Sequence, residues 1–336
     1  MSTDLTQDKV RPRGSGLQFL ASNEAGLLLI TIGFVALFVY LTPGFSSPFN
    51  IYALTRVLAI DAVIGFSMMV VIVTGGLNLA VGAIGVCAVM VGGYVMGTLG
   101  LPIVLGALAA LAAGTLLGLL NGVLTVLMRV HSFVVTLATM SLFFGAMIVL
   151  TKAQPISLPT EFVSLAKLKT YFFASSMLYV SLAIGALLWW LFHHTIAGRQ
   201  ILAAGANTAA ARLSGVPVER TIITCHALSG ALAAFAGLML AARNGAALPS
   251  MAGQLGADWL LPAFLAPVLG GTLLTGGNIS VVGTFLGATM VTVLTNGLLQ
   301  LKVGEFWVQA FLGVILLVAV ALDRLRAHII ERRRIR

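Results

Sequence analysis

The residues best suited to chemistry in this sequence are polar side chains inside long apolar stretches of the kind that form membrane-crossing helices. Asp61 lies near the middle of one stretch, and Asn121 and Asn296 lie inside two others. An Asp at the centre of a membrane helix costs about 2.5–3.5 kcal/mol on insertion scales. Asp61 must therefore pair with another group, bind a proton or face a polar cavity. We expect it to line a transport pathway or to anchor neighbouring helices.

A glycine-rich segment, Gly75-Gly76-Leu77-Asn78-Leu79, interrupts the apolar pattern. Glycine lets backbones approach closely, and an unwound segment exposes carbonyl and amide groups to a solute. Amide side chains suit a neutral solute that carries hydroxyl groups, although Asn also holds membrane helices together. The candidate pathway residues from these patterns are Asp61, Gly75, Gly76, Asn78, Asn121 and Asn296.

Residues for catalysis are not grouped in recognisable motifs. The ten carboxylates and five histidines are scattered, without an H-E-x-x-H or G-x-S-x-G motif. The phosphate-binding motif G-x-x-x-x-G-K-[ST] is also absent from the sequence. Cys87 and Cys225 lie in apolar segments and form no C-x-x-C pair. We expect no catalytic residue, no metal ion and no cofactor, and any ATP must be bound by a separate subunit.

The overall composition indicates which elements position these residues. Of the 336 residues, 59% are hydrophobic and only 9% are charged, whereas a soluble domain is about 25% charged. The mean hydropathy is +1.06. This composition excludes an ordinary soluble enzyme. It also excludes a nucleic-acid-binding protein, because the net charge of +9 is not spread over a polar surface. The expected fold class is an all-α polytopic membrane protein.

Ten apolar stretches approach the roughly 20 residues that a helix needs to cross the hydrocarbon core of a membrane. The predicted spans are residues 26–42, 51–73, 82–99, 102–127, 132–151, 172–192, 221–243, 258–275, 280–299 and 304–322. They divide the chain into a polar N-terminal tail, residues 1–25, a transmembrane domain, residues 26–323, and a basic tail, residues 324–336. We expect the first span, residues 26–42, to be an uncleaved transmembrane helix.

The basic residues predict the orientation of the chain. Ten spans place both termini on one side, and that side carries 13 of the 19 basic residues: Lys9, Arg11, Arg13, Arg129, Arg199, Arg212, Arg220, Arg324, Arg326, Arg332, Arg333, Arg334 and Arg336. Basic residues concentrate on the cytoplasmic side of membrane proteins. We therefore expect both termini in the cytoplasm, a cytoplasmic loop at 193–220 and an outer loop at 152–171. Arg56 is expected to reach the outer headgroups.

The cytoplasmic loop 193–220 contains an alanine-rich stretch, residues 203–214, which favours a helix that ends at Gly215 and Pro217. Residues 191–199 and 205–216 of this region, together with other segments, have a familiar pattern. The other segments are residues 74–82, Leu269-Gly270-Gly271-Thr272, Gly276-Gly277 and Val282-Gly283-Thr284. Together they resemble the permease subunits of bacterial ABC importers for ribose and related monosaccharides, over about residues 48–323.

This resemblance implies an all-helical permease in the bacterial inner membrane, surrounded by lipid, that pairs with a second copy or a paralogous permease. It further implies that a periplasmic sugar-binding protein delivers the solute and that a cytosolic ABC ATPase drives transport. Residues 203–215 would form the coupling helix that docks on the ATPase, and Thr272 joins the candidate pathway residues. The candidate coupling residues are Gly205, Asn207, Ala209, Ala210, Arg212, Ser214 and Gly215.

The sequence departs from the family pattern at several polar positions. Asn78 and Ala80 stand where the family has Asp and Ser, and Asp61 stands where it typically has Asn. Leu260 and Pro262 replace an acidic pair. We interpret the exchange between positions 61 and 78 as a sign that they share one polar environment. The missing polar groups favour a specialised branch of the family or one half of a heterodimer.

Two other functions remain open on the sequence. An autoinducer-2 import permease belongs to the same class. A proton-coupled secondary transporter that uses Asp61 as its proton carrier belongs to a different class. The loop 193–220 favours the ABC permease, because a secondary transporter has no use for an ATPase-docking helix. A membrane-embedded enzyme would need a catalytic constellation that the sequence lacks.

Overall fold

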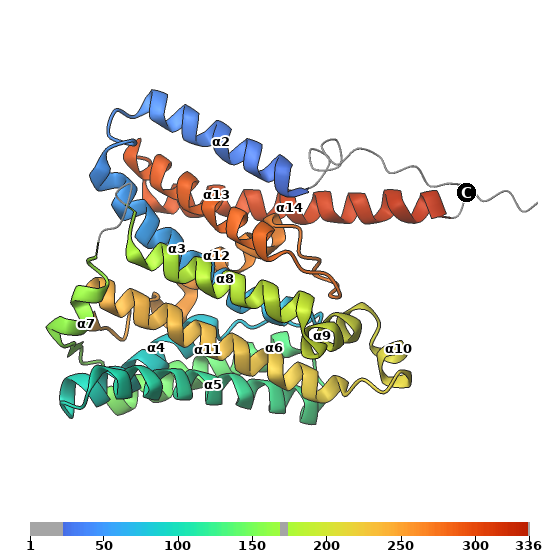
Figure 1. Ribbon diagram of the computed structural model, residues 1–336, viewed down its shortest axis with the longest axis horizontal. Helices are drawn as coiled ribbons and strands as arrows, with labels where there is room; N and C mark the ends of the chain where they lie inside the picture. The colour runs from blue at the N-terminus through green and yellow to red at the C-terminus, as the bar shows by residue number, and fades with distance from the viewer. Residues whose placement is uncertain (1–22, 169–173, 335–336) are drawn as a thin grey trace, which may run out of the picture.

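The computed structural model describes residues 23–168 and 174–334 (Figure 1). Its α-helices are α2 (Asn23–Leu41), α3 (Pro48–Ile72), α4 (Val81–Gly93), α5 (Ile103–Met128), α6 (Ser132–Thr151), α7 (Thr160–Leu165), α8 (Ser176–His194), α9 (Ile196–Ala206), α10 (Thr208–Leu213), α11 (Val218–Asn244), α12 (Leu260–Leu269), α13 (Val281–Gln300) and α14 (Glu305–Arg334). The π-helix η1 (Tyr94–Thr98) extends α4, and the 3₁₀ helix η3 (Gln254–Trp259) precedes α12. The strands β1 (Ile156–Ser157) and β2 (Ala246–Ala247) pair antiparallel. The all-α prediction is confirmed.

Eight described helices are long and apolar enough to cross a membrane. They are Glu24–Leu41, Pro48–Ile72, Val81–Thr98, Ile103–Met128, Ser132–Thr151, Ser176–His194, Val218–Asn244 and Val281–Gln300. Each coincides with a predicted span. The other two predicted spans coincide with shorter apolar helical segments, Gly256–Leu269 and Glu305–Val318. The chain is therefore a multi-pass membrane protein.

The predicted span 258–275 is only partly helical. Its α-helix, α12, ends at Leu269 and contains Pro267, which cannot donate a backbone hydrogen bond. Residues 270–280 then form a loop in which Gly276 and Gly277 have positive φ angles, where glycine is favoured. This pass is therefore completed by irregular backbone on both sides of α12. Hydropathy counts apolar residues and does not register such backbone geometry.

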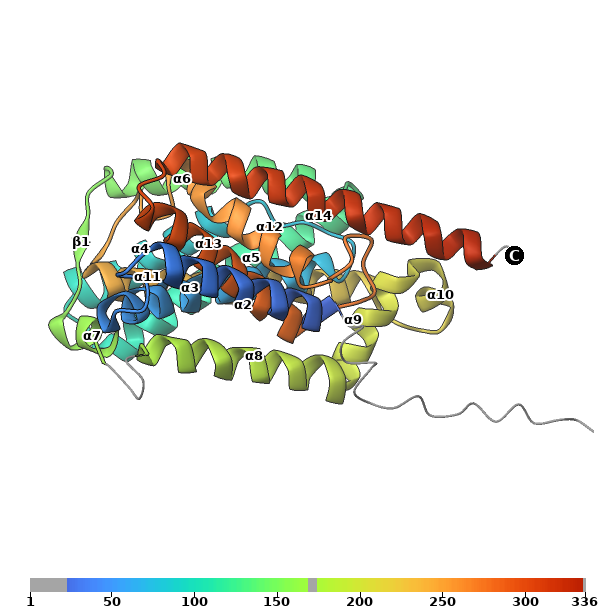
Figure 2. The same cartoon turned by 90° about the horizontal axis from the view of Figure 1, so that it is seen from above.

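The helices form a bundle with two distinct ends (Figure 1). The short helix α7 lies at one end, and α9 and α10 lie at the other, so we call these the α7 end and the α9–α10 end. Helix α2 begins, and α14 ends, at the α9–α10 end, as an even number of passes requires. Seen from above, α8 runs along one side of the bundle and α14 along the opposite side (Figure 2).

The centre of the bundle is built from α3, α4 and α11, with α5 packed closely against α4 and α11. Small residues recur at every fourth position of α5 and are buried there: Gly106, Ala110, Gly114, Gly118 and Gly122. A Cβ atom at Gly118 would collide with the backbone carbonyl of His226 on α11. Small residues in this spacing let membrane helices approach closely, so α5 and α11 form one rigid wall of the bundle.

The predicted coupling helix 203–215 is two helices and not one. Helix α9 ends at Ala206 and α10 begins at Thr208, with Asn207 between them in an extended conformation (φ −158°). The Asn207 side chain caps α10 by accepting a hydrogen bond from the Ala210 amide (3.0 Å). Asn is among the best N-cap residues. Local capping therefore wins over the helix propensity of the alanines, and the chain turns at Asn207.

The predicted terminal tails differ in how far the structure describes them. Most of the N-terminal tail 1–25 lies outside the described residues. The basic segment 324–336 is not a separate tail, because α14 continues without a break to Arg334. The last predicted span and this basic segment are therefore one helix. Arginine is a good helix former, so the helix need not end where the apolar residues do.

Candidate translocation site and coupling region

The unwound segment between α3 and α4, residues 73–80, is held by side chains from the start of α6. The Leu77 amide donates to the Ser132 hydroxyl (2.8 Å), and the Leu79 amide donates to the Thr136 hydroxyl (3.1 Å). A ring nitrogen of His131 lies 3.2 Å from the Gly75 carbonyl. Backbone groups in a membrane domain need such partners because no water is available in the hydrocarbon. The predicted interruption is present, and α6 stabilises it.

Asn78, in this segment, is completely buried in a network of polar side chains. Its amide nitrogen donates to the Ser229 hydroxyl (2.9 Å), and its amide oxygen accepts from the Ala80 backbone (3.1 Å). The Ser67 hydroxyl lies 2.9 Å from the Ser229 hydroxyl and 2.8 Å from the Ser229 carbonyl. In this conformation Asn78 therefore ties the unwound segment to α11 and, through Ser229, to α3.

Asp61 has a different partner on a different helix. Its carboxylate accepts a hydrogen bond from the Thr292 hydroxyl of α13 (3.0 Å). Asp61 and Ser67 lie six residues apart on α3, which places them about 120° apart around the helix. The prediction that Asp61 and Asn78 share one polar environment is therefore wrong. The sequence pattern could not show that the two positions face different neighbouring helices.

Arg56 contacts other residues of the protein and does not only face the lipid headgroups. Its guanidinium donates to the backbone carbonyl of Arg243 on α11 (3.4 Å) and lies 5.5 Å from the ring centre of Tyr52. Both arginines are half-buried. The expectation that Arg56 simply reaches the lipid headgroups did not foresee this contact. The cation holds the ends of α3 and α11 together at the α7 end.

Asn296 forms a reciprocal amide pair with Asn50. Each amide nitrogen donates to the other residue's amide oxygen, at 3.1 and 3.0 Å. Asn50 also donates to the Phe45 carbonyl (2.8 Å), and Gln300 donates to Asn296 (3.2 Å). These contacts join the start of α3 to the end of α13. Of the two roles that the sequence left open for Asn296, the geometry favours the helix anchor.

Asn121 and Thr272 are buried without a hydrogen-bond partner among the described residues. Both polar atoms of the Asn121 amide are unpaired, and so is the Nε2 atom of His226 on the facing helix α11. An unpaired buried polar group costs about 1–3 kcal/mol. Among the described candidate pathway residues, Asn121 and Thr272 are the two that are buried and have side-chain polar atoms without a hydrogen-bond partner.

Three chain segments meet backbone to backbone beneath α9, and we call this contact the glycine junction. The Gly277 amide donates to the Val73 carbonyl (2.8 Å). A Cβ atom at Gly205 would collide with the same Val73 carbonyl, and one at Gly276 would lie 2.8 Å from the Gly75 amide nitrogen. Residues 73–75, 205–206 and 276–277 therefore form one junction. Sequence reasoning missed it, because only the fold brings these segments together.

The glycine junction changes the role assigned to Gly205. This residue faces the bundle, whereas the remaining candidate coupling residues face outward and are exposed: Asn207, Ala209, Ala210, Arg212, Ser214 and Gly215. Arg212 forms an ion pair with Glu219 (2.6 Å). Leu213, which sequence reasoning passed over, is 92% exposed at the end of α10.

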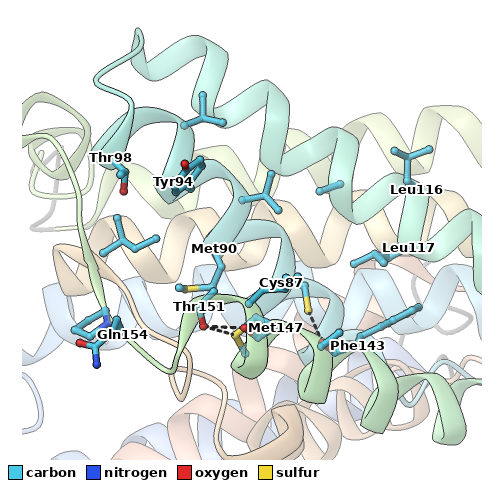
Figure 3. Close-up of a pocket in the computed structure, with 17 residues that line it drawn as sticks. Cys87, Met90, Tyr94, Thr98, Leu116, Leu117, Phe143, Met147, Thr151 and Gln154 are labelled. Carbon is cyan, nitrogen blue, oxygen red and sulfur yellow. Dashed lines mark hydrogen bonds between the residues drawn. The ribbon is translucent and has the colours of Figure 1, made fainter.

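Two hollows lie away from all of the predicted pathway residues. The larger, of about 800 Å³, lies between α4, η1, α5 and α6 and is lined mainly by apolar side chains (Figure 3). Its lining residues Leu116 and Leu150 are 63% and 82% exposed, so it opens sideways at the bundle surface. The smaller, of about 330 Å³, lies beside Phe66 and Trp189. Neither hollow offers the polar groups that a hydroxyl-rich solute requires.

The fold and these contacts define a multi-pass membrane permease in which an exposed helix pair is joined to interrupted segments inside the bundle. The chain belongs to the permease family described as "branched-chain amino acid transport system / permease component", whose model matches residues 48–320. The resemblance seen in the sequence is thereby confirmed at the level of the family.

Individual relatives are import permeases. The ribose import permease protein RbsC of Bacillus subtilis is 36% identical over 287 residues, which cover 84% of this chain and 87% of that protein. The fructose import permease protein FrcC of Rhizobium meliloti is 30% identical, covering 91% and 87%. The autoinducer 2 import system permease protein LsrD of Salmonella paratyphi B is 33% identical, covering 77% and 78%. No solved structure matches the chain significantly.

Proposed function

We propose that this chain is the transmembrane permease subunit of an ATP-driven import system for a monosaccharide or a similar small polyhydroxylated solute. The observation that carries the proposal is the glycine junction. It joins the exposed pair α9 and α10, where an ATPase would dock, to the unwound segment that contains Asn78 and to the loop that contains Thr272. Because backbone contacts at a glycine cannot be compressed, a displacement of α9 moves both segments.

The proposal assigns a side of the membrane to each partner. A cytosolic ABC ATPase docks at the α9–α10 end, and a periplasmic binding protein delivers the solute at the α7 end. Both termini then lie in the cytoplasm, which agrees with the excess of basic residues on that side. A second copy or a paralogous permease completes the pathway in the inner membrane. An autoinducer-2-type solute is the alternative within this class, because one relative carries that name.

The source of energy tests this function against proton coupling through Asp61. The chain is co-expressed with its ATPase and binding protein, and uptake of labelled ribose, fructose and autoinducer 2 is measured. We expect uptake to stop when ATP is depleted and to continue when a protonophore dissipates the proton gradient at constant ATP. Uptake that a protonophore abolishes while ATP is unchanged would instead support Asp61 as a proton carrier.

A further inference from the structure

The chain enters the membrane domain as irregular backbone between β2 and η3, and η3 then leads into α12. At the α7 end, a Cβ atom at Gly93 of α4 would lie 2.9 Å from the side chain of Ala247 in β2. Further along, Gly256 packs against the backbone of Gly82 at the opposite end of α4. Gly82 and Gly93 are eleven residues apart, or about 16 Å along the helix axis. Residues 247–256 thus run alongside α4 from the α7 end toward the middle of the bundle.

The position of Gly82 shows that this depth is well inside the membrane layer. Gly82 follows the unwound segment. In that segment the Leu79 amide donates to the Thr136 hydroxyl, and Thr136 lies one turn after the start of α6. The inner end of α4 is therefore recessed from the α9–α10 end. Helix α4 continues through η1 to Thr98, so Gly82 lies about 24 Å from the α7-side end of this pass. A hydrocarbon core is about 30 Å thick, so this depth is inside the membrane layer.

Two polar side chains of this segment are exposed at that depth. Gln254 and Asp258 are the first and fifth residues of η3, about 120° apart around the 3₁₀ axis, and both are exposed. Neither side chain forms a hydrogen bond or an ion pair with any part of the chain that the structure describes. Gly253 (φ +75°) lies directly beneath the Asp258 carboxylate, where a Cβ atom would collide with it. Trp259, which follows, is buried against Gly85 and fixes the turn.

Lipid cannot cover this surface. Irregular backbone at membrane depth is tolerated only where it is buried in protein or lines a water-filled cavity, and an ionisable side chain there obeys the same rule. Gln254 and Asp258 are not buried within this chain. The face that carries them must therefore meet water or a second permease chain.

We propose that Gln254 and Asp258 line the water-filled translocation pathway inside the membrane and there bind hydroxyl groups of the passing solute. This assignment rests on the proposed function for the identity of the solute. A carboxylate accepts hydrogen bonds from hydroxyl groups, and a carboxamide both donates and accepts. The two side chains together suit adjacent hydroxyl groups on a neutral, sugar-like solute. The charge of Asp258 disfavours anionic solutes.

Thiol labelling tests the lining of the pathway without relying on transport. In a chain whose Cys87 and Cys225 are replaced by Ala, Gln254→Cys is treated with cationic or anionic methanethiosulfonate in membranes that contain the assembled importer. We expect reaction at least about tenfold faster than at Leu187→Cys, an exposed apolar position on α8, because thiols react as hydrated thiolates. We also expect an approximately tenfold preference for the cationic reagent, which Asp258→Asn should remove.

Uptake tests the contact with solute. Asp258→Ala should reduce uptake of the transported sugar by about tenfold, as loss of a charge-assisted hydrogen bond predicts, with unchanged membrane abundance and ATPase co-purification. Labelling at the Leu187→Cys rate, or full uptake by Asp258→Ala, would overturn the proposal. If the wild-type importer transports none of the three solutes, the proposed function fails, while the labelling rates still decide whether this face is wet.

Discussion

Some buried amide side chains in this bundle have hydrogen-bond partners within the protein, and others have none among the described residues. We expect this difference to determine how much their substitution changes stability. Asn296→Leu removes both bonds to Asn50 and leaves the amide oxygen of buried Asn50 unpaired, so it should lower stability by about 1–3 kcal/mol. Asn121→Leu removes an amide that has no partner among the described residues, so it should be neutral or stabilising. Thermal unfolding of the purified protein in detergent measures both. Equal destabilisation by the two variants would contradict this division.

The separate surroundings of Asp61 and Asn78 lead to a second prediction. Had they shared one environment, Asn78→Asp would restore transport lost in Asp61→Asn. The structure places Asp61 beside Thr292 and Asn78 beside Ser229, so we expect no restoration, because changes at sites without shared partners add. Uptake and membrane abundance of both single variants and the double variant provide the measurement. If the double variant transported faster than Asp61→Asn alone, the two positions would be coupled although they share no contact in the structure.

At the scale of elements, we expect α9 and α10 to have separate roles in coupling. Gly205→Ala places a methyl group against the Val73 carbonyl in the glycine junction, so it should impair uptake while the ATPase still co-purifies. Ala210→Trp, on the exposed face of α10, should weaken ATPase docking through overpacking of about 1–3 kcal/mol, a loss of about five- to hundredfold in affinity. Its effect on thermal stability should be small.

Ala203→Ser is the matched control for these two variants, because it adds one atom to an exposed position of α9. Co-purification with the ATPase, together with sugar uptake, separates the outcomes. Normal uptake by Gly205→Ala would show that the glycine junction does not couple the helix pair to the bundle. Normal co-purification of Ala210→Trp would remove α10 as the docking helix.

At the scale of the whole molecule, a second permease chain would enclose the exposed polar face formed by Gln254 and Asp258. The two hollows described above are apolar and do not provide a passage for a sugar. We therefore expect the solubilised importer to contain two permease chains, measured by native mass spectrometry. Co-purification of an untagged copy with a tagged copy would identify a homodimer, and its absence would identify a paralogous partner. A complex with a single permease chain would contradict the prediction.

The membrane class and most of the passes follow from hydropathy, which is a property of contiguous residues and can be read from the sequence. The break at residues 75–79 and the helical character of residues 203–214 were predictable for the same reason. The errors lie where backbone chemistry overrides composition. Pro267 and the following glycines shorten the helix that hydropathy extended over 258–275, and Asn207 divides the alanine-rich helix by capping.

Only the tertiary structure decided which polar residues have partners and which are free. Asn50 and Asn296 are 246 positions apart in the chain, and no local pattern pairs them. Gly205 resembles an outward-facing coupling residue until the fold brings it against Val73. Asp258 is the first residue of a predicted span, and only the fold shows that its carboxylate lies against Gly253 and is exposed. Hydropathy and helix propensity are local properties, whereas exposure and pairing depend on which distant segments the bundle brings together.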